Sequence, residues 1–171
     1  MLEVGIGSGL NLPYYTDRVR RVFGLDPSVQ LQQMARTRAA GLPFEVEFMS
    51  QAAECPIALP TGSIDTVVLT WTLCSVDDPG LTLNEVRRVL KTDGRLVFIE
   101  HGSASELRVR TWQHRITPCW KRLTGGCHLN RHIRDILSRS GLECVDCQEG
   151  YLPGPRPLRF TYRGVAGRAA T

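Results

Sequence analysis

Three glycines alternate with other residues at the start of the chain, Gly5, Gly7 and Gly9, directly after the apolar run Leu2–Val4. An apolar run that ends in glycines is typical of a β-strand followed by a loop, and glycine lets such a loop approach a ligand closely. The dinucleotide fingerprint G-x-G-x-x-G requires a last glycine at the position that Leu10 occupies. The spacing therefore predicts a ligand-binding loop of a different class.

Two carboxylates accompany this glycine loop, by which we mean residues 5–9. Glu3 stands two positions before the first glycine, and Asp26 ends the apolar stretch at 20–25, about 20 residues further on. A carboxylate beside the loop disfavours an anionic pyrophosphate but favours the cationic sulfonium of S-adenosylmethionine. Asp26 can accept hydrogen bonds from both hydroxyls of a ribose. The loop and its two carboxylates therefore predict S-adenosylmethionine as the cofactor.

Strands and helices alternate in the pattern that follows. Runs rich in β-branched residues predict strands, and helical spacing of apolar residues predicts helices at 28–41, with Ser28 as N-cap, and at 81–90. Asp93-Gly94 predicts a turn before the fifth strand. This alternation predicts an α/β fold with a Rossmann-like, doubly wound, mostly parallel sheet. The five predicted strands cover residues 2–4, 20–25, 44–49, 64–70 and 95–100.

Two more strands are predicted near the C-terminus, at 143–147 and 159–166. A proline-rich stretch joins them without an intervening helix, so we expect them to be antiparallel. They complete a seven-stranded sheet with an antiparallel C-terminal strand, in a single domain at 1–171.

The segment between the fifth strand and this pair has helical spacing, which Pro118 is expected to interrupt, and a second helix is expected at 129–140. Residues 105–128 are interpreted as an inserted lid or substrate segment. From 105 to 140 the chain carries eight basic and two acidic side chains. Such a surface suits peripheral contact with a membrane, an acidic substrate or nucleic acid, and equally a solvated helix face.

The six cysteines are interpreted as reduced thiols of a cytoplasmic protein. The sequence has no secretory signal and no apolar run near the roughly 18 residues that cross a bilayer. Cys144 and Cys147 form a lone C-x-x-C in a predicted strand, where side chains three apart face opposite sides. We therefore predict no metal site.

Longer motifs extend the argument from the glycine loop to most of the chain. LEVGIGSG at 2–9, LDPS at 25–28, GSIDTVV at 62–68 and EVRRVLKTDGRLVFIEH at 85–101 resemble the class I methyltransferases, which use S-adenosylmethionine. Ala52 stands where many relatives carry aspartate, and Thr92-Asp93-Gly94 where Pro-Gly-Gly is usual. The resemblance implies cofactor contacts beyond Glu3, the three glycines and Asp26, namely Pro27, Ala53, Glu54, Thr70 and Cys74.

A narrower resemblance covers the second half of the chain. LCSV at 73–76, Glu100-His101, Trp112-Gln113, PCW at 118–120 and GCHLNR at 126–131 resemble the methyltransferase-like family of thiol methyltransferases. Members of that family methylate small alkyl thiols and associate with membranes through an N-terminal hydrophobic anchor. This chain shows no such anchor and no helix before its first strand, so we expect an N-terminally short domain with membrane association in question.

His101 is the candidate catalytic base, because it follows the C-terminal end of a central strand, the edge where open α/β sheets bind ligands. A thiol with a pKa of about 8.5 needs only mild help to ionise, which a histidine can supply. Packing is the alternative role for each candidate side chain. The candidate acceptor-site residues are Ser75, Trp112, Trp120, His128 and Arg131.

We therefore predict an S-adenosylmethionine-dependent methyltransferase acting on a small molecule, with a thiol as the first choice. The alternatives are a phospholipid head-group or quinone methyltransferase and a non-catalytic cofactor-binding or interaction domain. A nucleic-acid methyltransferase is disfavoured, because Thr70-Trp71-Thr72-Leu73 stands where an Asn/Asp-Pro-Pro-aromatic signature would follow the fourth strand.

Overall fold

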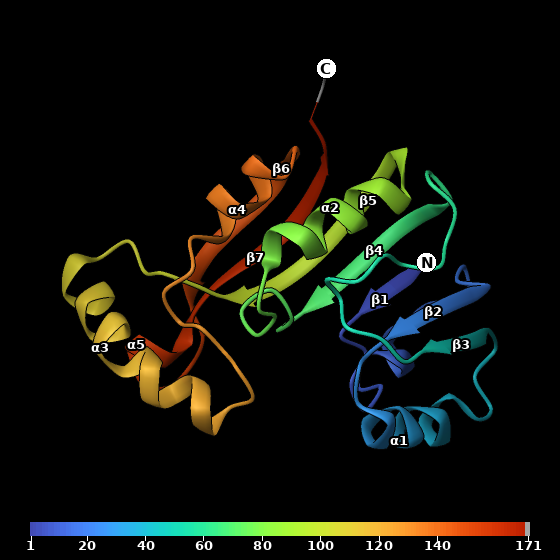
Figure 1. The fold of residues 1–171 in the computed structure, drawn as a ribbon, viewed down its shortest axis with the longest axis horizontal. Helices are drawn as coiled ribbons and strands as arrows, with labels where there is room; N and C mark the ends of the chain where they lie inside the picture. The colour runs from blue at the N-terminus through green and yellow to red at the C-terminus, as the bar shows by residue number, and fades with distance from the viewer. Residues whose placement is uncertain (170–171) are drawn as a thin grey trace.

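The computed structural model describes residues 1–169, so the last two residues of the predicted domain at 1–171 lie outside the described residues. One seven-stranded sheet has the order β3-β2-β1-β4-β5-β7-β6 (Figure 1). Neighbours from β3 to β5 are parallel, and β7 is antiparallel to both β5 and β6. The predicted Rossmann-like α/β fold with an antiparallel C-terminal strand is confirmed. The strands are β1 Leu2–Val4, β2 Arg21–Leu25, β3 Glu45–Met49, β4 Ile64–Thr70, β5 Leu90–His101, β6 Leu142–Tyr151 and β7 Phe160–Arg168.

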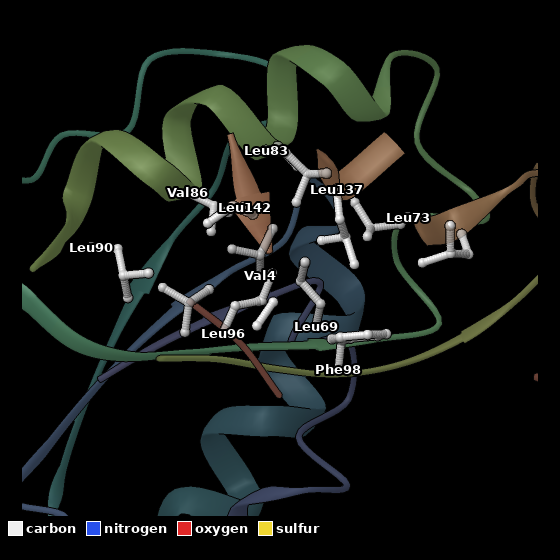
Figure 2. Close-up of a cluster of buried hydrophobic side chains, with 14 of the residues drawn as sticks. Val4, Leu69, Leu73, Leu83, Val86, Leu90, Leu96, Phe98, Leu137 and Leu142 are labelled. Atoms are coloured by element: carbon white, nitrogen blue, oxygen red, sulfur yellow. The ribbon is translucent and has the colours of Figure 1, made fainter. Parts of the chain in front are cut away.

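The main core lies between the sheet and two helices, α2 (Pro79–Val89) and α4 (Ile133–Arg139). Leu83 of α2 meets Val4 of β1 and Leu69 of β4 in this layer, as Figure 2 shows. All three side chains are fully buried, and burial of such a side chain stabilises the fold by about 1.5–3 kcal/mol. The central strands are thereby held rigidly, with their carboxyl ends at one edge of the sheet.

A second core cluster lies on the opposite face, because Val22 of β2 belongs to it whereas Leu25 belongs to the first. The short helix η1 (Leu12–Tyr14) and the end of α1 (Val29–Ala39) contribute to this cluster. The predicted N-cap of α1 is confirmed, since Ser28 Oγ accepts a hydrogen bond of 3.3 Å from the Leu31 N–H. Helices therefore cover both faces of the sheet around β1 and β2.

Helix α3 (Leu107–Leu123) lies beside the short α5 (Arg156–Arg159), at the opposite end of the sheet from α1 (Figure 1). The predicted interruption at Pro118 is wrong: α3 continues through the proline. Gln113 before the proline and Trp120 after it both dock on neighbouring segments, so packing holds the two halves in one helix. Within residues 1–169, no helix has the length and apolar character that crossing a bilayer requires.

Other elements also differ from the sequence prediction. The short helix α5 lies in the proline-rich stretch that was expected to join the last two strands without a helix. A turn was predicted at Asp93-Gly94, but β5 continues through these residues. They lie at a register shift between β4 and β5, after the pair Ile64–Leu90 and before the pair Thr66–Arg95. α4 begins only at Ile133, because the Arg131 carbonyl accepts a 2.8 Å hydrogen bond from the Ser103 N–H instead of continuing a helix.

The prediction of six reduced thiols is wrong for one pair, since Cys144 and Cys147 form a disulfide with their Cα atoms 5.7 Å apart. The register of β6 shifts between Cys144 and Asp146, so one extra residue brings both side chains to the same face. The other cysteines are free: Cys55 and Cys119 are exposed, and Cys74 and Cys127 are buried.

Candidate active site

A cavity of about 630 Å³ opens beside the carboxyl ends of β1, β2 and β4. This is the edge at which open α/β sheets bind ligands, and the volume lies in the usual range for small-molecule sites. Seven predicted site residues line the cavity: Gly5, Asp26, Pro27, Ala53, Glu54, Thr70 and Ser75.

The glycine loop is tied to the end of β2 by Asp26. One carboxylate oxygen accepts a 2.9 Å hydrogen bond from the Gly7 N–H, and the other accepts one of 2.8 Å from the Ser28 N–H. Gly5 and Gly9 have positive φ angles of 75° and 78°, a conformation that favours glycine. Gly7 and Gly9 shape the loop from outside the cavity lining, whereas Gly5 contributes to it.

Glu3 supports the glycine loop through hydrogen bonds to residues just after it. Its side chain is buried and accepts 2.8 Å hydrogen bonds from Asn11 Nδ2 and from the Tyr15 hydroxyl. Burial raises the pKa of Glu3 above its ordinary value, and these two donors oppose the rise. The carboxylate lies outside the cavity lining, so its geometry is that of a positioning residue, and direct contact with the cofactor stays a prediction.

The loop after β4 is organised by Glu100, which sequence reasoning named only within a family motif. This fully buried carboxylate accepts three backbone hydrogen bonds, from the N–H groups of Thr72 (2.8 Å), Leu73 (2.9 Å) and Cys74 (3.1 Å). The loop starts at Trp71, whose φ angle of 56° is unusual for a bulky residue and which contributes to the cavity lining. Glu100 therefore fixes the wall that carries Trp71, Thr72 and Ser75.

His101 lies behind this wall rather than in the cavity lining. Its ring stacks on the Trp71 indole with 4.3 Å between centroids. Its Nδ1 is 3.4 Å from the Cys127 sulfur and 4.0 Å from the Cys74 sulfur. Interaction with Cys127 and burial raise the pKa of the Cys74 thiol to about 12, while Cys74 lowers the pKa of Cys127. The two thiols are therefore unequal, and Cys127 ionises more readily.

The other predicted acceptor residues surround this group without lining the cavity. His128 is held between two partners, because Nδ1 donates to the Cys74 carbonyl at 3.2 Å and Nε2 accepts from Lys121 at 3.2 Å. Burial, with help from nearby Arg131, lowers the pKa of His128, which suits a neutral ring. Arg131 donates to the carbonyls of Leu73 and Asp77 and so supports the loop after β4.

The two tryptophans of α3 differ in their surroundings. Trp112 is 56% exposed and lies away from the cavity lining, whereas Trp120 packs on Cys127 and its neighbours. Most basic side chains of α3 are exposed to solvent. Membrane-binding helices and ordinary solvent-facing helices share this exposure, so the membrane contact stays a prediction.

Sequence reasoning missed several residues that line the cavity. The pair Gly125-Gly126 was a visible signal, because glycines after a helix often mark a close approach of the backbone. Asp77 is placed by its N–H, which donates to Glu54 Oε1 at 2.8 Å. The remaining lining residues are Leu25, Ser28, Leu31, Ala52, Trp71, Thr72 and Val76.

Comparisons with known proteins agree with this geometry. A family model described as "Methyltransferase domain" matches residues 2–98. Human thiol S-methyltransferase TMT1B is 37% identical over 99% of this chain and 69% of its own length, and the rat protein is 36% identical over 80% and 57%. This chain therefore spans between 57% and 69% of the length of these two relatives.

A crystal structure of a methyltransferase from Methanosarcina mazei, described as SAM-dependent, shows the same fold. It has a TM-score of 0.78 with 20% identity, over 99% of this chain and 92% of that one. The glycine loop, Asp26 and these matches lead to one conclusion: the chain belongs to the methyltransferase-domain family of S-adenosylmethionine-dependent methyltransferases.

Proposed function

We propose that this protein transfers the methyl group of S-adenosylmethionine to a small thiol. The observation that carries the proposal is the extent of the similarity to thiol S-methyltransferases. The general methyltransferase model ends at residue 98, whereas the match to the human relative continues over 99% of the chain. The additional region includes α3 and the segment around Cys127, and two residues of this region, Gly125 and Gly126, line the cavity.

The residues of the cavity fit the cofactor. A Cβ on Gly5 would lie 2.2 Å from the Thr72 hydroxyl, so glycine lets these two lining residues pack closely against each other. Asp26 and Glu54 place carboxylates along the wall that extends from the glycine loop. These residues would hold the ribose and the adenine.

The chemistry divides between cofactor and protein. When bound, S-adenosylmethionine supplies an activated methyl group on a sulfonium. The tasks of the chain are to align a thiol in line with that group, to exclude water and to accept the thiol proton. Trp71, stacked on His101, covers the wall next to Ser75. Nδ1 of His101 faces the two cysteine sulfurs, so Nε2 is the atom that would accept a proton.

The test of this proposal measures methylated products by mass spectrometry. The protein is incubated with S-adenosylmethionine and an alkyl thiol, the alcohol of the same chain length, phosphatidylethanolamine vesicles or a reduced quinone. We expect a methyl thioether from the thiol alone. Methylation of the lipid or the quinone in place of the thiol would contradict the proposed acceptor. No product together with no binding of S-adenosylhomocysteine would support a non-catalytic domain instead.

Replacing Asp26 by alanine is expected to weaken binding of S-adenosylhomocysteine by about 10- to 100-fold, since hydrogen bonds to a charged group contribute about 1.5–3 kcal/mol. The change also releases the N–H groups of Gly7 and Ser28. Isothermal titration calorimetry measures the affinity. The matched control is Asp93→Ala, which removes an exposed carboxylate far from the lining. Equal affinities in the two variants would show that Asp26 does not contact the ligand.

A further inference from the structure

Three side chains from three separate segments converge behind the wall of the cavity. Cys74 comes from the loop after β4, His101 from the end of β5 and Cys127 from the segment after α3. Their ligand atoms all lie within 4.8 Å of one another. Both cysteines are buried, with exposed fractions of 1% and 5%, and their sulfurs are not joined in a disulfide.

The spacing of these atoms matches the edges of a tetrahedral zinc site. With Zn–S of about 2.3 Å and Zn–N of about 2.0 Å, a sulfur and a nitrogen ligand in a tetrahedral site should be about 3.5 Å apart. His101 Nδ1 is 3.4 Å from the Cys127 sulfur and 4.0 Å from the Cys74 sulfur, on either side of that value. The donor set is two thiol sulfurs and one imidazole nitrogen. Sulfur and imidazole ligands favour zinc over Mg²⁺ or Ca²⁺, which prefer oxygen ligands.

The surroundings hold the ligands in place. The Cys74 N–H donates a hydrogen bond to Glu100. The Cys74 carbonyl accepts a 2.6 Å hydrogen bond from the backbone N–H of His128, the residue after Cys127, so the two cysteine segments are joined next to the sulfurs. His101 is held by its stacking on Trp71. Such preorganisation by neighbouring groups is typical of metal sites.

One buried donor near the sulfurs makes no hydrogen bond of ordinary geometry among residues 1–169. It is the indole Nε1 of Trp120, a residue that packs on the cluster containing Cys74 and Cys127. Buried N–H groups are nearly always hydrogen-bonded, so this exception requires an explanation. A metal-bound thiolate beside the indole would be a stronger acceptor than a neutral thiol.

We propose that Cys74, His101 and Cys127 form a binding site for a zinc-class divalent cation. Binding would form two S–metal bonds and one N–metal bond, and the two thiol protons would pass to solvent. Three protein ligands leave the fourth position to water or another exogenous ligand. The cation would join the three segments that back the cavity wall. This site would reverse the sequence-based prediction of no metal. With Nδ1 bound to the cation, Nε2 would carry the ring proton, so in the metal-bound protein the proton of the acceptor thiol would pass to solvent rather than to His101.

The experiment measures metal directly, without an activity assay. The protein is purified under reducing conditions, loaded with Zn²⁺, passed over a desalting column and analysed for metal content. We expect about one zinc per chain that resists desalting, as for other sites with thiolate ligands. Loading with Co²⁺ instead should give the thiolate-to-cobalt charge-transfer bands and the intense visible bands of tetrahedral coordination.

Matched variants assign the site. Cys127→Ser and His101→Asn should each lose the retained zinc and the cobalt spectrum, whereas Cys55→Ser and Cys119→Ser, which change exposed cysteines, should keep both. Circular dichroism checks that the first two variants remain folded, and Cys74→Ser provides a third test of the ligand set. Zinc retained by Cys127→Ser or His101→Asn, no zinc in the folded wild-type protein, or a Cys74–Cys127 disulfide that persists under reducing conditions would each overturn the proposal.

Discussion

Replacing Gly5 by alanine is expected to destabilise the protein by about 3 kcal/mol and to abolish binding of S-adenosylhomocysteine. The φ angle of Gly5 is +75°, and a Cβ there would lie 2.2 Å from Thr72 Oγ1 and 3.0 Å from Thr72 Cγ2. Thr72 cannot easily move aside, because its hydroxyl donates a 2.9 Å hydrogen bond to the Val4 carbonyl. Urea unfolding measures the stability, and calorimetric titration measures the binding.

Two variants separate the steric clash from backbone strain. Gly62 also has a positive φ angle, +63°, but a Cβ there would meet no atom within 4 Å. Gly62→Ala should therefore lower the free energy of unfolding only by the backbone strain of about 1–2 kcal/mol, and it should bind S-adenosylhomocysteine as wild type does. The double variant Gly5→Ala with Thr72→Ala removes the two closest contacts and should recover part of the lost stability. Equal losses in Gly5→Ala and Gly62→Ala would show that the clash is unimportant.

The cofactor half of the site could be predicted because its signals are local in sequence. Gly5 and Asp26 each end a strand, and parallel neighbouring strands bring those ends together at one edge of the sheet. Glu54 and Thr70 were implied by the resemblance to the class I methyltransferases, and both line the cavity. The sheet itself was predictable for a similar reason, since the period of the apolar residues reports which side chains face the core.

The other half of the site depends on contacts that no local pattern contains. Cys74, His101 and Cys127 belong to segments separated by more than twenty residues each, and their meeting depends on how α3 docks. Glu100 followed an apolar run and gave no local sign that it accepts three backbone hydrogen bonds. The Cys144–Cys147 disulfide was missed because a strand bulge, which reverses the facing of side chains, leaves little trace in the sequence.

Replacing Glu100 by glutamine is expected to lower the free energy of unfolding by about 1–3 kcal/mol, the usual range for a buried polar group that loses its partner. Oε1 accepts from the N–H groups of Thr72 and Leu73, and Oε2 accepts from that of Cys74. Glutamine keeps the size of the side chain, but its amide NH₂ must then face an N–H group. Because this loop forms the cavity wall, binding of S-adenosylhomocysteine should weaken as well. Glu143→Gln, which changes an exposed carboxylate, is the matched control and should alter neither property.

The pH dependence of the stability difference between wild type and Glu100→Gln tests whether burial keeps Glu100 protonated in the folded protein. Burial raises the pKa of Glu100 well above its ordinary value, with Cys74 adding to the rise, while the three N–H donors oppose it. The folded protein therefore holds this proton more tightly than the unfolded chain does. As the pH rises from the unfolded pKa of about 4.3 through the folded pKa, the wild-type protein loses the stability that this group contributes, and the glutamine variant does not. The stability advantage of wild type over Glu100→Gln should thus be largest at low pH and shrink as the pH rises. An advantage that grows with pH would mean that the three N–H donors outweigh burial and hold Glu100 ionised.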